Sequence, residues 1–441
     1  MAFNNKPKKL HLIFHFNAFA TLLFILVFTV PLLFIILHTS TSSLCTSCVS
    51  DNLKAWSGDL RDAQFAWNRL PFLRIRSPPV VLKIAVFFTE MANWHRSWRH
   101  GVPCLQQYNL HLALARRGHR VHVFTSPLVN RDHPGTRVQH FPIPLEFISM
   151  KVKRRVALPH RLARNLKNLA VSWHVIGLEP MSPAFNDSLY GVVPKVLDEI
   201  RFFHKYNYHA AISDSCGEML WDVYQIPRRR VHVILNGVDE HDFQNDLSLG
   251  LEFRAKIGVP ISGSLLGVAG RLVKDKGHPL LYEAFSKLIT KHPHVYMIVT
   301  GNGLWENRYK ELGHQVQVLG SMSPSKLKAF YNAMDIFVNP TLRPQGLDLM
   351  LIEAMMSGKA VVASSFPSIV VNNEFGFMFS PKAESLLEEL EEVVREGPKR
   401  LAQRGKTAQE YAASMFTASK MALAYERLFL CIKNDTFCVY P

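Results

Sequence analysis

Acidic residues are scarce in this sequence of 441 residues, which has 35 Asp and Glu against 51 Lys and Arg and a formal net charge of +16. The resulting pI near 9.6 favours anionic partners, such as phosphorylated substrates, a membrane surface or nucleic acid. The chain also lacks a basic helix and an aromatic patch interleaved with basic residues. Because both are typical of nucleic-acid binding, we expect no nucleic-acid partner.

No internal repeat with a period of about 20–50 residues is visible, so the sequence does not predict a repeat architecture. The hydrophobic content of 48% with 20% charged residues is that of a folded protein. A chain of 441 residues has room for two domains, each with its own core.

Charge is absent from Ala18–Leu37, which reads AFATLLFILVFTVPLLFIIL. At about 1.5 Å per residue such a run spans a bilayer core of roughly 30 Å. The competing interpretation is a cleaved signal peptide, whose apolar region is usually only about 7–15 residues long. We therefore predict a cytosolic tail at residues 1–17 and a transmembrane signal anchor at residues 18–38.

Lysines at positions 6, 8 and 9 precede this run, so the positive-inside rule places the globular part on the lumenal side. The prediction is a single-pass type II protein of the Golgi or endoplasmic reticulum membrane. In that oxidising compartment Cys431 and Cys438 are the best disulfide candidates. Asn186 and Asn434 begin sequons for N-glycosylation, a modification that this topology would allow.

A second pair, Cys45 and Cys48, has the spacing of a redox or metal motif. No second Cys/His pair with ligand spacing accompanies it, so a structural disulfide or two stalk cysteines is the simpler interpretation. The sequence predicts no metal site.

Strand and helix patterns begin only near Leu82, and residues 39–80 are therefore interpreted as a stalk. A buried strand, a helix near Leu105–Arg117 and a second strand then form a βαβ unit with a parallel sheet. We assign residues 81–239 to an N-terminal, acceptor-binding Rossmann-like domain. The polar run Glu240–Gly250 is the predicted domain boundary.

A second α/β pattern follows, with strands at Leu265–Ala269, Val295–Thr300, Val316–Leu319, Ile336–Asn339 and Ala360–Ala363. We assign residues 240–415 to a C-terminal donor domain, and residues 416–441 to a helix and tail that could return to the N-terminal domain. The fold prediction is α/β: two facing, doubly wound Rossmann-like domains with a ligand cleft between them.

The loop GRLVKDKG carries Arg271 and Lys276 just after the first strand of this second domain. A diphosphate needs cations near both phosphoryl groups, and a planar guanidinium with an ammonium supplies them. An ordinary solvated basic loop is the alternative.

Further along, Gln345 and Gly346 lead into a predicted helix at Leu347–Ser357 that carries Glu353. Exposed amides at a helix N-terminus favour a phosphate or a sugar hydroxyl. Glu353 ends an apolar run, so its carboxylate needs a partner. A nucleoside ribose is one such partner, and a structural Arg or Lys is the other.

These motifs, together with ISDSCGEML and VHVILNGVD at 212–239 and RRGHRVHVFTS at 116–126, resemble those of retaining GT-B-fold glycosyltransferases of family four (glycosyl transferases group 1). The similarity is greatest to a plant, membrane-anchored branch and covers about residues 82–430. It implies transfer of a sugar from a UDP-sugar or GDP-sugar donor with retention of configuration. It also implies that no cofactor and no divalent metal is needed.

Residue by residue, the resemblance implies that Arg271 and Lys276 bind the donor diphosphate and that Glu353 binds the ribose. It places the backbone amides of Leu347 and Asp348 against phosphate or sugar.

The catalytic candidates are His174, near the reacting sugar carbon, and Gln345, at a position where the family usually has a glutamate. Gly101 lies in the loop near the acceptor and phosphate. For His174 a packed or solvent-facing histidine is the alternative.

Three departures from the family pattern are Gln345, Val175 after His174, and a single glycine at Gly101 where two are usual. They keep open a catalytically impaired binding or scaffold protein, while a nucleotide-sugar epimerase is less favoured because of the anchor. The acceptor, whether glycan, lipid or small molecule, cannot be identified from the sequence.

Overall fold

The computed structural model describes most of the chain from residue 56 onward. The described positions are 56–70, 78, 80–88, 103–125, 145–149, 172–175, 197, 200, 203, 204, 206–342, 347–365 and 371–440. The predicted tail and anchor at residues 1–38 lie outside this part. Within it, no helix is both long enough and apolar enough to cross a membrane.

A six-stranded sheet forms the core of the C-terminal part. Its strands are β8 (Ser264–Ala269), β9 (Val295–Thr300), β10 (Val316–Gly320), β11 (Ile336–Asn339), β12 (Ala360–Ser364) and β13 (Gly376–Phe379). The spatial order is β10-β9-β8-β11-β12-β13, and all neighbours are parallel. Numbered along the chain this is the doubly wound order 3-2-1-4-5-6, which reverses between β8 and β11.

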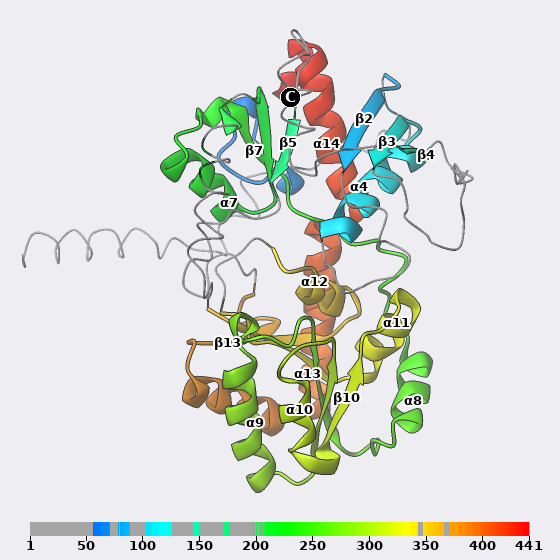
Figure 1. Cartoon of the computed structure of the whole chain (residues 1–441), viewed down its shortest axis with the longest axis vertical. Helices are drawn as coiled ribbons and strands as arrows, with labels where there is room; N and C mark the ends of the chain where they lie inside the picture. Colours follow the sequence, from blue (N-terminus) through cyan, green and yellow to red (C-terminus); the bar gives the residue numbers. More distant parts are fainter. Residues whose placement is uncertain are drawn as a thin grey trace, which may run out of the picture. The chain divides into compact units, whose positions relative to one another are not determined.

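Helices cover both faces of this sheet. They are α8 (Leu247–Lys256), α9 (His278–Lys291), α10 (Glu306–Lys310), α11 (Pro324–Ala333), α12 (Leu349–Met356) and α13 (Ala383–Met415). Successive strand residues enter opposite apolar clusters: Leu265 and Ile298 pack with residues of α11 and α12, whereas Leu266 and Val299 pack with residues of α9 and α13. Figure 1 shows these helices around the sheet. Burial on both faces explains why the inner strands are mostly apolar, whereas the edge strand β10 is partly exposed and contains Gln317.

The N-terminal part contains two three-stranded parallel sheets within the described residues. They consist of β2 (Lys83–Phe88), β3 (Arg120–Thr125) and β4 (Leu145–Ser149), and of β5 (Ser172–Val175), β6 (Tyr208–Ala211) and β7 (Val231–Val233). The helices α4 (Pro103–Arg116) and α7 (Asp214–Glu218) belong to this part. The predicted βαβ unit is therefore β2-α4-β3.

Residues 57–70 belong to the folded part, so the predicted stalk at residues 39–80 is wrong for this segment. The two-residue strand β1 (Gly58–Asp59) pairs antiparallel with β14 (Val439–Tyr440). Four apolar residues of the segment have no exposed surface: Leu60, Ala66, Trp67 and Leu70. These residues are buried one at a time by short 3-10 turns. Such turns give the sequence no repeating pattern of apolar residues, so the segment is not recognised as folded from its sequence.

Asn68 ties this segment to the two stretches of chain that connect the N-terminal and C-terminal parts, residues 235–239 and 415–418 (the crossing segments). Its Oδ1 accepts a hydrogen bond from the backbone nitrogen of Leu235 at 2.7 Å. Its Nδ2 donates to the carbonyl oxygens of Leu235 at 3.2 Å and Met415 at 3.3 Å. One buried side chain therefore holds both crossing segments.

The crossing segments also bond to each other. The backbone nitrogen of Val238 donates to the carbonyl oxygen of Phe416 at 2.9 Å. The backbone nitrogen of Ala418 donates to the carbonyl oxygen of Val238 at 2.8 Å. A Cβ at Gly237 would lie 2.3 Å from the carbonyl oxygen of Thr417. Glycine is therefore needed for this close approach.

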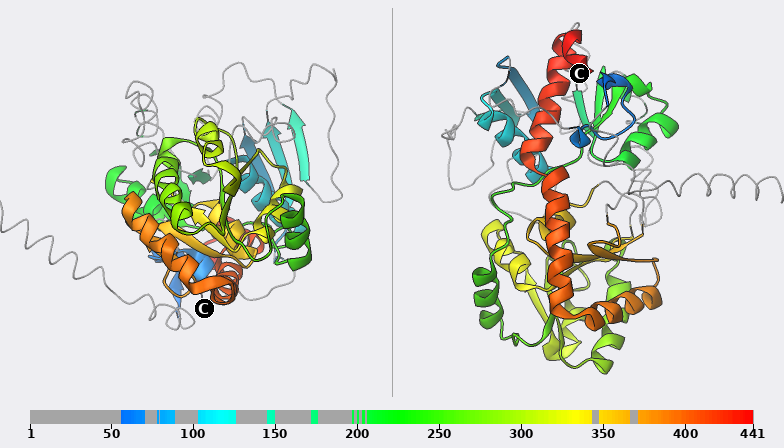
Figure 2. Two further views of the ribbon diagram at one scale, coloured as in Figure 1. Left: turned by 90° about the horizontal axis from the view of Figure 1, so that it is seen from below. Right: turned by 180° about the vertical axis from the view of Figure 1, so that it is seen from behind.

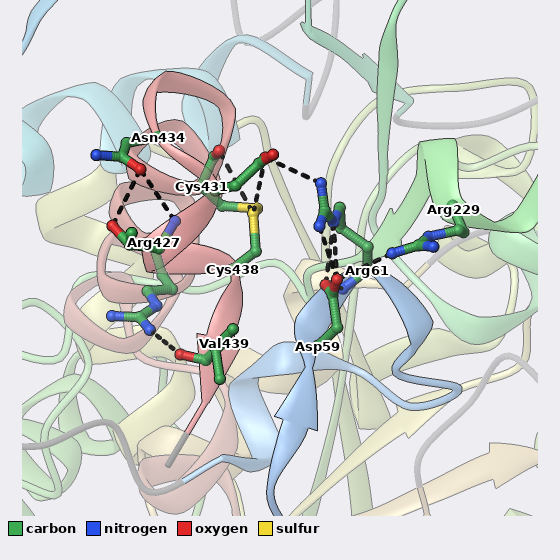
Figure 3. Close-up of a disulfide and its surroundings, with 10 residues drawn as sticks. Asp59, Arg61, Arg229, Arg427, Cys431, Asn434, Cys438 and Val439 are labelled. Carbon is green, nitrogen blue, oxygen red and sulfur yellow. Dashed lines mark hydrogen bonds and ion pairs between the residues drawn. A yellow bond between two sulfur atoms is a disulfide. The ribbon is translucent and has the colours of Figure 1, made fainter.

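The final helix, α14 (Ala418–Lys433), returns to the N-terminal part, as the sequence allowed. Its Glu426 accepts hydrogen bonds from Arg117 at 2.5 and 3.0 Å and lies 2.8 Å from Nε2 of His119, so α14 is anchored to the end of α4. The predicted disulfide Cys431–Cys438 is present and closes the loop after α14 (Figure 3).

Several predicted elements differ from the structure. The polar run Glu240–Gly250 overlaps the start of α8, where Asp246 accepts a hydrogen bond from the nitrogen of Leu249 at 3.0 Å as the N-cap. The strands β4 and β13 were not predicted. The helix expected within residues 416–441 begins at Ala418, after a break at Phe416, and α13 before it runs from Ala383 across a kink at Gly397 (Figure 2).

We expect Asn68→Ala to lower the free energy of unfolding by about 3 kcal/mol, because it leaves the buried nitrogen of Leu235 without a partner and removes two further hydrogen bonds. Urea unfolding of the full chain measures this change. Asn307→Ala, at an exposed position on α10, is the control and should change stability little. Equal effects of the two substitutions would contradict the role given to Asn68.

Acid should destabilise the N-terminal part between pH 6.5 and about 4. Burial lowers the pKa of His209 to about 4 and that of His232 to about 3. Since these folded-state values lie below the unfolded value near 6.5, the stabilisation is complete above pH 6.5 and is lost as the pH falls. At pH 5 the loss is about 2 kcal/mol for each histidine. Thermal unfolding of the wild type and of His232→Asn between pH 7.5 and 4.5 tests this, and the variant should lose less.

Candidate functional site

The candidate site lies at the carboxyl ends of β8 and β11, where the strand order reverses and ligands of doubly wound sheets bind. Residues 270–277 (the β8 loop) follow β8, and residues 340–342 follow β11. The backbone nitrogen of Leu342 donates to the carbonyl oxygen of Asp275 at 3.1 Å. The backbone nitrogen of Leu272 donates to the carbonyl oxygen of Asn302 at 2.9 Å. The β8 loop is therefore attached to the segments that follow both neighbouring strands, β9 and β11.

Two glycines permit this packing. Gly277 has φ of +77°, and a Cβ there would lie 1.7 Å from the carbonyl oxygen of Pro340. Gly301, which follows β9, has φ of +128°, and a Cβ there would lie 1.7 Å from the carbonyl oxygen of Gly270. Any larger residue would force the β8 loop away from the sheet.

Arg271 presents its guanidinium to solvent. The side chain is 58% exposed, and its nearest acidic group is Asp275, with 3.7 Å between the guanidinium nitrogen and the carboxylate oxygen. An exposed pair at this distance contributes little to stability. The guanidinium is therefore accessible to an anionic ligand.

Lys276 is held at the N-terminus of α12. Its Nζ lies 3.0 Å from Oδ2 of Asp348, and the two side chains are only 12% and 4% exposed. The other oxygen of Asp348 accepts a hydrogen bond from the nitrogen of Met350 at 3.2 Å and caps the helix. The structure thus brings Lys276 to Asp348, next to Leu347, and the ion pair between them was not predicted from the sequence.

Glu353 is 3% exposed and faces α11. Its Oε2 accepts a hydrogen bond from the hydroxyl of Tyr331 at 2.8 Å. Burial raises the pKa of Glu353 to about 8 and also raises the pKa of Tyr331. The partner in the structure is therefore a tyrosine, and not the Arg or Lys that the sequence offered as the structural alternative.

Polar atoms at the end of β11 are also buried in this region. Nδ2 of Asn339 and Oγ1 of Thr341 have no hydrogen-bond partner among the described residues, although the two side chains are only 5% and 1% exposed. The sequence analysis did not single them out, because one Asn and one Thr after a strand form no distinctive pattern. These two polar atoms are available to form hydrogen bonds with a ligand at the carboxyl ends of β8 and β11.

His278 was also missed. It follows Gly277 directly, at the first position of α9, and is 1% exposed. Its Nε2 lies 3.0 Å from the carbonyl oxygen of Arg271. Its place beside the GRLVKDKG loop was the one sequence signal available.

Other predicted residues are not tested by the geometry. Gln345, Gly101 and Asn186 lie outside the described residues. His174 is in β5 and pairs with Ala210 of β6, but only its backbone is described. Asn434 is exposed and accepts a hydrogen bond from the nitrogen of Thr436 at 3.0 Å. In the part of the chain that the structure covers, no cluster of His, Cys, Asp or Glu could hold a metal ion.

Comparison with protein families matches residues 251–411 to the family Glycosyl transferases group 1. The matched region begins in α8 and ends in α13, and it contains the β8 loop, both strands at the reversal point and α12. The candidate site of the C-terminal part therefore lies wholly within the matched region.

Curated relatives resemble part of the chain. An uncharacterized glycosyltransferase of Methanocaldococcus jannaschii is 28% identical over 219 residues, which are 47% of this chain and 55% of that protein. Lipopolysaccharide 1,2-N-acetylglucosaminetransferase of Salmonella typhimurium is 26% identical over 153 residues, 32% of this chain and 40% of that protein. The D-inositol 3-phosphate glycosyltransferase of Corynebacterium aurimucosum is 27% identical over 192 residues, 40% and 45% of the two chains. The chain thus spans about half the length of these relatives.

Solved structures extend the likeness to most of the chain. Sucrose-phosphate synthase from Thermosynechococcus elongatus superimposes with a TM-score of 0.65 at 17% identity, covering 80% of this chain and 100% of that one. Anabaena HepE in complex with UDP and glucose superimposes with a TM-score of 0.59 at 17% identity, covering 79% and 99%. Such identities establish the fold alone. The chain therefore has the α/β GT-B fold of glycosyltransferases, and its residues 251–411 match the Glycosyl transferases group 1 family.

Proposed function

We propose that the protein is a glycosyltransferase that transfers a sugar from a nucleotide-diphosphate sugar to an acceptor. The observation that carries the proposal is the contact of Lys276 with Asp348 at the start of α12, made from a loop that also carries Arg271, at the strand reversal of a group 1 domain. Cations near a helix N-terminus favour a diphosphate at this place.

Asp348 affects how Lys276 can serve a phosphate. An ammonium has three N–H donors, and the bond to Asp348 at 3.0 Å uses one of them. Lys276 can therefore bridge the carboxylate and a phosphoryl oxygen, and its charge keeps the carboxylate from repelling the ligand. Arg271, with its exposed planar guanidinium, binds the second phosphoryl group in this proposal.

The donor and acceptor are proposed only by chemical class. Anabaena HepE was solved with UDP and glucose, and this supports a nucleotide sugar such as a UDP-sugar or GDP-sugar as donor. The names of the curated relatives refer to lipopolysaccharide and to inositol 3-phosphate, so acceptors differ among them. A glycan, a lipid or a small molecule remains the acceptor class.

The proposed reaction retains configuration and needs no divalent metal. The leaving diphosphate gains negative charge as its bond to the sugar carbon breaks, and Arg271 and Lys276 offset that charge. No protein nucleophile is then required. His174 and Gln345 are the proposed contacts to the donor sugar, and Gly101 lies on the acceptor side.

A lumenal location in the Golgi or endoplasmic reticulum, with an anchor at residues 18–38, remains part of the proposal. Two features of the folded part support it: the disulfide Cys431–Cys438, which persists in oxidising compartments, and the exposed sequon at Asn434. Both lie at the C-terminal end of the described chain.

A binding protein without turnover is the second candidate. Two observations favour it: position 345 has a neutral glutamine where the family usually has a carboxylate, and Asp348 already offsets the charge of Lys276. Release of nucleoside diphosphate from a nucleotide sugar separates the two functions, since only the transferase produces it.

The cation pair is tested by nucleotide binding. Arg271→Ala and Lys276→Ala should each weaken the binding of UDP or GDP to the full chain about tenfold or more, since each removes a charged hydrogen-bond donor. Lys274→Ala removes an exposed cation from the same loop and serves as the matched control. Calorimetry with and without EDTA measures the affinities, and EDTA should change none of them. If the wild-type chain unfolds cooperatively but binds neither UDP nor GDP, the proposal is wrong.

Glu353→Gln should stabilise the ligand-free protein while weakening nucleotide binding. The folded-state pKa of Glu353 is raised to about 8, so its contribution to stability is lost as the pH rises from about 4.5 through 8. A glutamine can accept the Tyr331 hydrogen bond without this loss, so the variant should gain roughly 2–3 kcal/mol at pH 7. Unfolding at pH 5 and pH 8, with exposed Glu252→Gln as control, measures the gain. If Glu353→Gln leaves the nucleotide affinity unchanged, Glu353 does not bind the ribose.

A further inference from the structure

We infer that His278 is a positioning residue that fixes the backbone from which Arg271 reaches the ligand. Its Nε2 lies 3.0 Å from the carbonyl oxygen of Arg271, and its Nδ1 lies 2.8 Å from the hydroxyl of Tyr309 on α10. This role rests on the proposed function, because it matters only if Arg271 binds a diphosphate.

The hydrogen-bond partners determine the tautomer of His278. A carbonyl oxygen can only accept, so Nε2 must carry the proton and donate it to Arg271. Nδ1 is then an acceptor, and Tyr309 donates its hydroxyl proton to it. The chain of bonds therefore runs in one direction, from Tyr309 through His278 to the carbonyl oxygen of Arg271.

Burial supports a fixed and neutral imidazole. His278 is 1% exposed, and Tyr309 has no exposed surface. Their rings pack edge to face, with 5.6 Å between centroids. Burial lowers the pKa of His278 to about 4, so the ring is neutral at physiological pH and keeps one donor and one acceptor.

The carbonyl oxygen of Arg271 also accepts a hydrogen bond from the nitrogen of Val273 at 2.9 Å. With His278 as the second donor, both lone pairs of this oxygen are used. The Arg271 side chain, in contrast, is 58% exposed, and its ion-pair partner among the described residues is Asp275 at 3.7 Å. The point from which the Arg271 side chain leaves the loop is therefore set by the backbone, and the His278 bond holds that backbone.

Removing the donor should weaken ligand binding without touching the ligand. In the full chain, His278→Leu should lower the affinity for UDP or GDP by roughly tenfold, because a misplaced charged group binds poorly. His278→Gln places an amide donor within reach of the same oxygen and should restore part of the affinity. Tyr309→Phe keeps the packing but removes the bond that orients the imidazole, and it should have an intermediate effect.

His209 offers a matched control. Its side chain has no exposed surface, its Nε2 lies 3.0 Å from the carbonyl oxygen of Phe203, and burial lowers its pKa to about 4. It lies on β6, in the N-terminal part. His209→Leu should therefore reduce the melting temperature about as much as His278→Leu and leave nucleotide affinity unchanged.

The outcomes are distinct. Weakened affinity in His278→Leu, partial recovery in His278→Gln and no change in His209→Leu support the positioning role. A proton on Nε2, seen for His278 by nitrogen-15 NMR, supports it as well. Equal affinities of the wild type and His278→Leu overturn the role but leave the proposed function standing. A folded wild-type chain that binds neither nucleotide overturns both.

Discussion

The backbone of Gly277 lies so close to the carbonyl oxygen of Pro340 that no Cβ fits between them. This contact joins the β8 loop to the segment after β11, across the point where the sheet reverses its strand order. Lys276 precedes Gly277, and the close approach carries it to the start of α12, where it meets Asp348. The placement of the proposed phosphate-binding groups therefore depends on the glycine at position 277.

Around this contact lie buried polar and titratable side chains, and their burial lowers the stability of the fold. Glu353 is buried and accepts a hydrogen bond from Tyr331, and the imidazole of His278 remains neutral in the core. Asn339 and Thr341 leave polar atoms unused within the described structure. A region optimised for stability alone would avoid such groups. Their presence beside the strand reversal is consistent with a ligand-binding site there.

Much of the C-terminal part could be predicted because its strands are buried on both faces and appear as short apolar runs. The bounds of β9 and β11 agree with those expected from sequence, and Arg271 and Lys276 lie where the loop after the first strand was expected. The partners of these residues could not be predicted. Tyr331 is 22 positions away from Glu353, and nothing in the pattern of α11 marks it as polar and inward-facing.

The segment at residues 57–70 could not be predicted for a different reason. Its apolar residues are buried through isolated 3-10 turns, so they show neither the period of a helix nor that of a strand. Asn68 looks like any polar loop residue, although it holds both crossing segments. The strands β4 and β13 were also missed.

The pairing of β1 with β14 has a mechanical consequence. Gly58 faces Tyr440 and Asp59 faces Val439, so both ends of the described fold leave from one two-stranded ribbon, next to the disulfide that ties Cys438 to the end of α14 (Figure 3). Tension applied between residues 57 and 440 would load this ribbon first and would unzip it from its end, before it reached the ion pair of Arg61 with Asp435. Fusion partners attached at the two ends would be neighbours, and a short linker joining them would permit circular permutation of the fold.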